Sequence, residues 1–216
     1  MELILNQPQQ IEMIVLSSHS DKSAMVQDMR KLCEQKDIPI TINDRLLDRL
    51  SKSDNTFAAG IFRKYPATLD HNASHVVLVN PDDMGNIGTI LRTMLGFEYR
   101  NLAIIAPAAD VFHPKSIRAS MGALFQQQVE YFDTIETYHA AFPAHTLYPF
   151  MLESAQPLAQ TTFNVPHSLV FGNEGAGLSA DYANRGTPVH IEQGARIDSL
   201  NLAVAVSVGL YKVYIS

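Results

Sequence analysis

The chain has 216 residues, 46% of them hydrophobic and 18% charged, so it carries enough apolar side chain for a core and lacks the composition of a disordered protein. Its net charge of −6 excludes a bulk nucleic-acid binder, which would be basic, so any contact with RNA must rest on a local basic surface. We expect no signal peptide and no membrane span, and the lone Cys33 cannot form an internal disulfide; these features predict a cytoplasmic protein.

Residues 1–70 predict a small α/β domain. Apolar patterns favour strands at 11–18, 38–43 and 56–64. Helical spacing favours helices at 21–37 and 44–51. A mixture of Pro, Asn, Asp and Ser at 63–74 indicates a break between domains, which we place at residue 70.

Residues 71–216 continue the alternation and predict a second α/β domain. The expected strands are 75–80, 102–107, 127–132, 145–151, 167–172 and 188–192, and the expected helices are 86–98, 114–126, 134–143 and 199–214. Such alternation favours a mostly parallel sheet covered by helices on both faces. Ligands of these sheets bind at the carboxyl ends of the strands, so the turns that follow the strands are the candidate sites.

The first candidate turn lies in NPDDMGNIGTILRT (80–93), between a strand and a helix. The side chain of Asn86 can either cap the helix or face a ligand at the strand end. Arg92 follows on a helix that is otherwise apolar, so its guanidinium must reach a partner or solvent. A capped helix with an arginine extended into solvent is the structural alternative to a binding site.

The second candidate turn is FGNEGAGLS (171–179). It matches the phosphate-binding loop of nucleotide triphosphatases except that Leu178 replaces the required lysine. Glu174 would also repel a phosphate, and the glycines at 172, 175 and 177 do not fit the dinucleotide-binding spacing. A turn with an internal carboxylate suits a ligand that offers hydrogen-bond donors or positive charge. A purely structural turn between strand and helix is the alternative.

The third candidate is IEQGARIDSLNLAVAVSVGLYKV (191–213). Asp198 and Ser199 can each cap the last helix, and Asn201 would then lie in its first turn. A polar group heading an apolar helix is often only a cap. The chain has three strand ends that are followed by glycine or asparagine, and this favours one shared ligand site over separate helix caps.

Taken together, GNIGTILRT, FGNEGAGLS and IEQGARIDSLNLAVAVSVGLYKV resemble, in order, the three motifs of the SpoU/TrmH branch of the SPOUT RNA methyltransferases. HPKSIRASMGALF (113–125) also resembles a stretch typical of that branch. The resemblance covers residues 75–216. Residues 1–70 are similar, more weakly, to the small substrate-binding domain that many members carry, here shortened.

The resemblance implies an α/β fold whose C-terminal segment forms a trefoil knot, although knots are otherwise essentially absent from proteins. It implies S-adenosylmethionine as the cofactor and methyl transfer to a ribose 2′-oxygen of tRNA or rRNA. It also implies a homodimer, and no metal or membrane is involved.

Site residues are implied by the same resemblance. Cofactor contacts are expected from Gly172, Asn173, Glu174, Gly177, Ile191, Ser199, Leu200 and Asn201. The reaction centre is expected to hold Asn86, Arg92, Glu174, Ser199 and Asn201. The usual Ile-Pro-Met before the last helix is replaced by Ile191-Glu192-Gln193, and Ala195 takes the customary glycine position, so the ligand loop is expected to differ in shape.

RNA phosphates are expected to meet basic side chains, namely Arg92, Lys115, Arg118, Arg63 and Lys64. An arginine is always protonated, so we expect Arg92 to hold the target phosphate and align the 2′-hydroxyl rather than to act as a base. A catalytically inactive module that binds cofactor or RNA is the alternative function, whereas a nucleotide hydrolase is disfavoured by Leu178.

Overall fold

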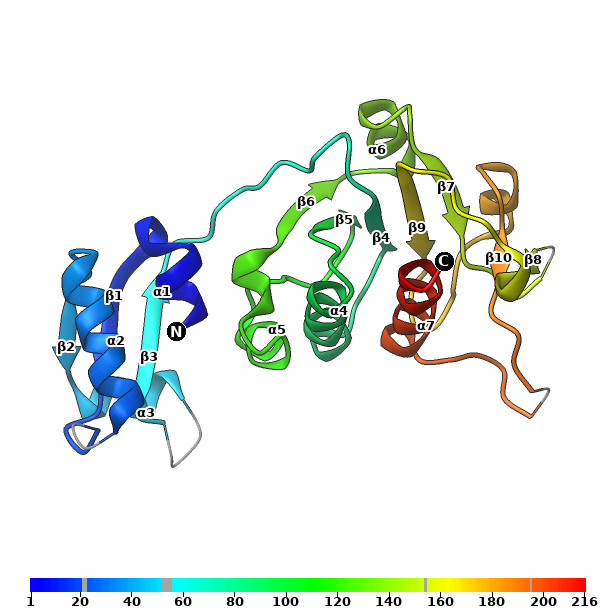
Figure 1. Ribbon diagram of the computed structural model, residues 1–216. Coiled ribbons are helices and arrows are strands. Elements are labelled where there is room, and N and C mark those ends of the chain that lie inside the picture. The colour runs from blue at the N-terminus through cyan, green and yellow to red at the C-terminus, as the bar shows by residue number, and fades with distance from the viewer. Residues whose placement is uncertain (21–22, 52–55, 154, 195) are drawn as a thin grey trace. The chain divides into compact units, whose positions relative to one another are not determined.

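The computed structural model covers residues 1–216 and describes all of them except 21–22, 52–55, 154 and 195. The chain divides into two compact units, Met1–Tyr65 and Pro66–Ser216 (Figure 1). The boundary lies within the Pro- and polar-rich segment 63–74, which contains no helix or strand. Each unit has its own buried apolar core and is described separately below.

The first unit is a three-stranded sheet with short helices. Its elements are α1 (Glu2–Asn6), η1 (Pro8–Gln10), β1 (Ile11–Leu16), α2 (Ala24–Gln35), β2 (Ile40–Ile42), α3 (Asp44–Leu50) and β3 (Ala58–Phe62). The strand order is β2-β1-β3, with β2 parallel and β3 antiparallel to β1. Apolar residues of β1 and α2 form its core together with the buried Cys33.

The second unit carries a five-stranded parallel sheet. Its elements are β4 (His75–Val79), α4 (Met84–Gly96), β5 (Asn101–Ile105), α5 (Pro114–Ala119), η2 (Ala123–Gln126), β6 (Gln128–Phe132), α6 (Ile135–Ala141), β7 (Thr146–Pro149), β8 (Gln156–Pro157), η3 (Leu158–Gln160), β9 (His167–Phe171), η4 (Ala180–Asn184), β10 (Val189–His190) and α7 (Leu202–Tyr214). The strand order is β6-β5-β4-β9-β7. The predicted parallel sheet is therefore present.

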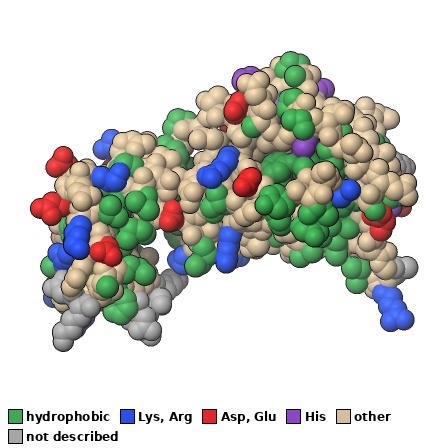
Figure 2. Space-filling model, viewed as in Figure 1, with side chains coloured by type: hydrophobic (Ala, Val, Ile, Leu, Met, Phe, Trp, Pro, Cys, Tyr) green, Lys and Arg blue, Asp and Glu red, His purple; other side chains and the backbone are tan. Residues whose placement is uncertain are grey.

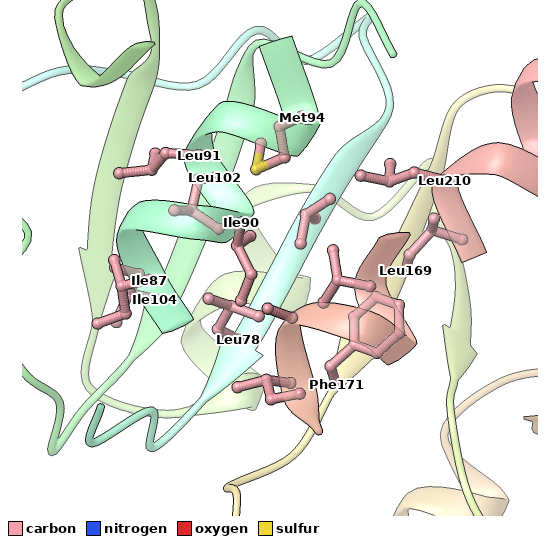
Figure 3. Close-up of a cluster of buried hydrophobic side chains, with 14 of the residues drawn as sticks. Leu78, Ile87, Ile90, Leu91, Met94, Leu102, Ile104, Leu169, Phe171 and Leu210 are labelled. Carbon is pink, nitrogen blue, oxygen red and sulfur yellow. The ribbon is translucent and has the colours of Figure 1, made fainter. Parts of the chain in front are cut away.

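The two faces of the sheet bury different side chains because successive residues of a strand point to opposite faces. Val76 and Leu78 of β4 pack with residues of α4 and α7 in one core, part of which is drawn in Figure 3. Val77 and Val79 pack with α6 in the other. Each fully buried aliphatic side chain of this kind contributes about 1.5–3 kcal/mol relative to an exposed one. The central strands β4, β5 and β9 are buried at every position.

Two expected helices differ in extent. The single helix expected at 114–126 is split into α5 and η2, because Met121 and Gly122 between them adopt φ angles of 52° and 89°. Such left-handed residues cannot continue a right-handed helix. The last helix begins at Leu202 rather than at 199, because Asn201 is its N-cap. Asn201 therefore does not lie in the first turn, and the cap expected from Asp198 or Ser199 is wrong.

The strand expected at 188–192 does not join the main sheet. Only Val189 and His190 form a strand, β10, which pairs in parallel with β8. A bridge from Phe150 to Val189 holds this small pair beside the end of β7. The described residues between β10 and α7, 191–194 and 196–201, form no strand.

Candidate functional site

A cavity of about 290 Å³ lies at the carboxyl ends of β7 and β9 and beside the start of α7. Seven of the residues expected to contact a cofactor line it, namely Gly172, Asn173, Glu174, Gly177, Ile191, Ser199 and Leu200. Asn201 is the eighth, and it lies directly after Leu200 without lining the cavity. The turn after β9 and the segment before α7 thus form two walls of one concavity, although they are distant in sequence.

The turn after β9 is closed tightly on itself. Asn173 and Gly177 form an antiparallel bridge, with the Gly177 N–H donating to the Asn173 carbonyl at 2.9 Å. A Cβ on Gly172 would lie 2.2 Å from the carbonyl carbon of Gly177, which no real atom pair tolerates. Gly177 itself has φ +67°, a conformation that side chains rarely adopt. The close backbone approach explains why glycine is needed at both positions.

The side chain of Asn173 holds this turn against the end of β4. Its Oδ1 accepts from the Gly175 N–H at 2.8 Å and the Ala176 N–H at 3.2 Å. Its Nδ2 donates to the Asn80 carbonyl at 2.8 Å. The carboxamide therefore shapes the turn and anchors it to the neighbouring strand.

Glu174 is oriented by the start of α4. Its carboxylate accepts from the backbone N–H groups of Asp82 and Asp83, at 3.2 Å each, and from Asn86 Nδ2 at 3.1 Å. N–H groups before a helix lack partners within the helix, and a carboxylate satisfies them with favourable charge. Glu174, which would repel a phosphate, is thus a fixed hydrogen-bond acceptor. Its hydrogen bonds link the second motif to the first.

Asn86 is also hydrogen-bonded to a residue of the third motif. Asn201 Nδ2 donates to Asn86 Oδ1 at 3.1 Å. The Oδ1 of Asn201 accepts from the Ala203 and Val204 N–H groups, at 2.9 and 3.4 Å, and so caps α7. Glu174, Asn86 and Asn201 form one hydrogen-bonded chain behind the cavity wall.

Asp83, rather than Asn86, is the N-cap of α4. Its Oδ1 accepts from the Asn86 N–H at 2.8 Å, and its Oδ2 accepts from Lys115 Nζ at 3.0 Å. The hydrogen bond from Lys115, followed by that from the Asn86 backbone, lowers the pKa of the Asp83 carboxyl. The capping role considered for Asn86 is therefore wrong, and Lys115 is engaged by Asp83 across α4 and α5.

Arg92 lies on the exposed side of α4 and does not line the cavity. Six residues correspond to about 240° of helical rotation, so its side chain leaves α4 in a different direction from that of Asn86. Within the part of the chain that the structure describes, Arg92 makes no hydrogen bond or ion pair. The structure thus joins Asn86, Glu174 and Asn201 directly but leaves Arg92 free to meet an incoming group.

Ile191, Gln193 and Asp198, which follow β10, form another wall of the cavity. Gln193 lines the cavity and donates from Nε2 to the Asp198 carbonyl at 3.4 Å, which closes this loop. Glu192 accepts from the Ala159 N–H at 3.4 Å and does not line the cavity. Ala195, at which a changed loop shape was expected, lies outside the described residues.

Sequence reasoning missed the apolar wall of the cavity. Phe150 and Phe171 stack with ring centroids 4.2 Å apart and an interplanar angle of 24°. A Cβ on Gly209 of α7 would lie 2.9 Å from the ring of Phe150, so α7 packs directly on this pair. Both aromatic residues lie at the carboxyl end of a strand, and that position was the available signal. The remaining lining residues, which were not expected to contact the cofactor, are Met151, Leu152, Gly175, Ala176, Gln193, Asp198, Leu202 and Ala205.

The other basic candidates are surface residues of the two units. Arg118 is exposed on α5. In the first unit, the Arg63 guanidinium pairs with the Glu12 carboxylate at 2.9 Å, and Lys64 follows it at the surface. None of these residues lines the cavity.

Metal ligation and membrane insertion find no support in the described part of the chain. Its His, Cys, Asp and Glu residues form no cluster of three or more that could hold a metal ion. None of its described helices is long and apolar enough to cross a bilayer. The cavity therefore offers backbone groups, carboxamides, a hydroxyl and two aromatic rings, a combination suited to a nucleoside-like organic ligand.

Comparisons with known proteins identify relatives of this chain. The model of the SpoU rRNA Methylase family matches residues 73–211. An uncharacterised tRNA/rRNA methyltransferase of Synechocystis is 35% identical over 147 residues, 66% of this chain and 53% of that protein. The 23S rRNA (uridine(2479)-2′-O)-methyltransferase of Streptomyces viridochromogenes is 32% identical over 150 residues, 63% of this chain and 50% of that protein. The chain thus spans about half the length of the curated relatives it matches.

Among solved structures, the AdoMet-bound rRNA methyltransferase of Sinorhizobium meliloti superposes with a TM-score of 0.83. The superposition covers 99% of this chain and 84% of that one, at 22% identity. This likeness extends over both units and establishes a common fold.

Proposed function

Because this chain belongs to the SpoU rRNA Methylase family, we propose that it transfers a methyl group from S-adenosylmethionine to a ribose 2′-oxygen of tRNA or rRNA. The observation that carries the proposal is the hydrogen-bonded chain from Glu174 through Asn86 to Asn201. It joins one residue from each of three motifs at the wall of a single cavity. Two similar proteins, from Streptomyces viridochromogenes and Bacillus subtilis, are named as 2′-O-methyltransferases of 23S rRNA, which supports the choice of reaction.

The cavity fits the cofactor we propose. The Cβ position of Gly172 is taken by the backbone of Gly177, and Gly172, Ile191 and Leu200 all line the cavity, where their backbone groups are proposed to bind the adenosine part of the cofactor. The stacked rings of Phe150 and Phe171 add an apolar wall. S-adenosylmethionine, when bound, supplies a methyl group activated by an adjacent sulfonium. The solved structure of the similar Sinorhizobium protein holds AdoMet, which supports this choice.

The residues of this chain then orient the acceptor. Glu174 fixes the carboxamide of Asn86, and Asn86 fixes that of Asn201, so both amides are set before a substrate arrives. Ser199 presents a hydroxyl at the cavity. Arg92, exposed and permanently charged, binds the target phosphate and aligns the 2′-hydroxyl; the proton leaves to a phosphate oxygen or to water, because a guanidinium does not accept one.

We also propose that the enzyme is a homodimer with α7 at its interface. Val204, Tyr211, Tyr214 and Ile215 of the α7 region are 47%, 54%, 58% and 58% exposed. Phe97 of α4 extends this surface, with its ring 6.1 Å from that of Tyr211. Hydrophobic side chains gather over α7 in Figure 2. An exposed apolar patch of this kind is typical of an interaction surface.

Further parts of the proposal rest on the family and on composition. We infer that 191–216 is the segment threaded in the trefoil knot, since α7 returns to pack beside α4 after β10. We place RNA binding on Arg92, Lys115 and Arg118, and on Arg63 and Lys64 of the first unit. A cytoplasmic location is proposed because the chain has a single cysteine, Cys33, and it is free.

Methyl transfer is tested with S-adenosylmethionine labelled on its methyl group and total RNA from cells that lack the protein. We expect label in one class of RNA, at a linkage that resists alkaline hydrolysis because the 2′-oxygen is blocked. Cofactor binding without transfer to any RNA would overturn the proposal in favour of a catalytically inactive binding module. Label at an alkali-sensitive linkage would exclude the ribose 2′-oxygen as the acceptor.

A further inference from the structure

A group of buried polar side chains lies at the amino ends of β4 and β9, at the opposite edge of the sheet from the cavity. His75 and Ser168 are fully buried, and Tyr138 of α6 has no exposed surface. His145 is 4% exposed. Buried polar atoms are costly unless they are hydrogen-bonded, so the partners of these four side chains decide how they are accommodated.

The four side chains form one row between two backbone carbonyl groups. From one end to the other, the contacts are Asp70 O to His75 Nε2 at 2.8 Å, His75 Nδ1 to Tyr138 Oη at 2.8 Å, Tyr138 Oη to Ser168 Oγ at 2.6 Å, Ser168 Oγ to His145 Nδ1 at 3.0 Å, and His145 Nε2 to His71 O at 3.1 Å. Each distance is that of a hydrogen bond.

A hydrogen count shows that this row is one proton short when both imidazoles are neutral. A neutral imidazole carries one N–H, and tyrosine and serine each carry one O–H, which makes four hydrogens. The row contains five contacts, and the carbonyl oxygens at its ends can only accept. Whichever tautomers are chosen, one contact then brings two lone pairs together. A fifth hydrogen would satisfy every contact.

We propose that this row is a binding site for a single proton, which His75 and His145 share through the hydroxyl groups of Tyr138 and Ser168. With the proton on His75, the hydroxyl hydrogens point toward His145. With the proton on His145, they point toward His75. The two arrangements have the same number of hydrogen bonds, so the pair titrates as one unit. The row does not bind a second proton, because two imidazolium cations with ring centroids 4.4 Å apart would repel each other.

Burial and neighbouring groups determine the pH at which the row binds its proton. Burial lowers the pKa of the His75 imidazole to about 4, opposed by the carbonyl of Asp70. Burial also lowers the pKa of the His145 imidazole, opposed by the carbonyls of His71 and His167. The remaining titratable groups around the row are the Asp70 carboxylate, which favours a cation, and the His71, His139 and His167 imidazoles, which disfavour one. We therefore expect the row to bind its proton below neutral pH.

Side-chain nitrogen NMR of the whole 15N-labelled chain, recorded from pH 7.5 down to the onset of acid unfolding, tests the proposal. We expect the ring nitrogens of His75 and His145 to shift with one common midpoint and to account together for one proton. The exposed imidazole of His19 provides an internal reference. Separate midpoints for the two residues, or no protonation of either before unfolding, would overturn the proposal.

The variant Tyr138→Phe provides the matching test. It leaves three contacts and three hydrogens, so neutral imidazoles satisfy the row and the common midpoint should disappear. Ser168→Ala gives the same count and serves if the first variant does not fold. Tyr131→Phe removes a hydroxyl of the same unit that belongs to a different contact, with the Val111 N–H, and should leave the common midpoint unchanged. A common midpoint that persists in Tyr138→Phe or Ser168→Ala would contradict sharing through these hydroxyls.

Discussion

Asn86 and Asn201 lie 115 residues apart in the chain and share a hydrogen bond of 3.1 Å, from Asn201 Nδ2 to Asn86 Oδ1. Each side chain has a second task in its own motif. Asn86 donates to Glu174, and Asn201 caps α7. The contact therefore fixes the start of α4 relative to the start of α7, where Ser199, Leu200 and Leu202 line the cavity.

The two tasks of Asn201 are separable by substitution. Asn201→Asp keeps an oxygen for the Ala203 N–H but places a carboxylate against Asn86 Oδ1. We expect thermal stability close to that of the wild type and methyl transfer reduced by up to about tenfold, since a typical hydrogen bond contributes about 0.5–1.5 kcal/mol. Asn201→Ala also loses the cap, worth about 1 kcal/mol, so its melting temperature should fall further. Equal activity in Asn201→Asp and wild type would contradict the role of the contact.

Gly172→Ala tests the close approach within the turn after β9. The added Cβ would meet the Gly177 carbonyl carbon at 2.2 Å, so the turn must open, at a cost of about 1–3 kcal/mol. We expect a lower melting temperature and weaker binding of S-adenosylmethionine by calorimetry. Gly175→Ala is the matched control, because its Cβ would only reach Asn173 Oδ1 at 3.5 Å. Equal affinities of the two variants for S-adenosylmethionine would contradict the proposed role of Gly172 in cofactor binding.

Arg92→Ala separates binding of the acceptor from binding of the cofactor. Because Arg92 does not line the cavity, we expect an unchanged dissociation constant for S-adenosylmethionine. Methyl transfer should fall about 10²-fold or more, the usual scale for losing a group that positions a reactant. Arg100→Ala removes another exposed arginine of the same unit and should have little effect on either quantity. Normal turnover by Arg92→Ala would exclude the arginine from the mechanism.

The stability of the protein should depend on the protonation of His75. Its pKa of about 4 in the folded state lies below the value of about 6.5 expected in the unfolded chain. The unfolded state thus binds the proton first, and the contribution to stability, present in full above pH 6.5, is lost as the pH falls toward 4. The integrated loss is about 3 kcal/mol. Urea unfolding at several pH values should show that the free energy of unfolding depends less steeply on pH in His75→Gln than in the wild type.

Tyr211→Glu tests the proposed dimer. The side chain is 54% exposed on α7, so a charge there costs the isolated chain little but would be buried unpaired at an interface. We expect sedimentation analysis to show a dimer for the wild type and a monomer for this variant. Met25→Glu places the same charge on a 67% exposed side chain of the first unit and should leave the dimer intact. A monomeric wild type would contradict the proposal directly.

Local patterns predicted most elements correctly because strand and helix periodicities depend on few neighbours. They failed where a tertiary contact or a backbone angle decided the outcome. The helix expected at 114–126 breaks at Met121, whose left-handed angle follows from how the chain turns toward β6. The caps also depended on side-chain geometry, because Asp83 and Asn201 each had polar neighbours that could have served equally well.

The sequence by itself determined the parallel α/β architecture, the motif glycines and the absence of a phosphate-binding lysine at Leu178. Only the tertiary structure decided what Glu174 does, because its partners come from a different strand end 88 to 92 residues away. The same holds for the aromatic wall of Phe150 and Phe171 and for the row from His75 to His145. Long-range contacts have no local signature, since they arise only when parallel strands bring their ends together at one edge of the sheet.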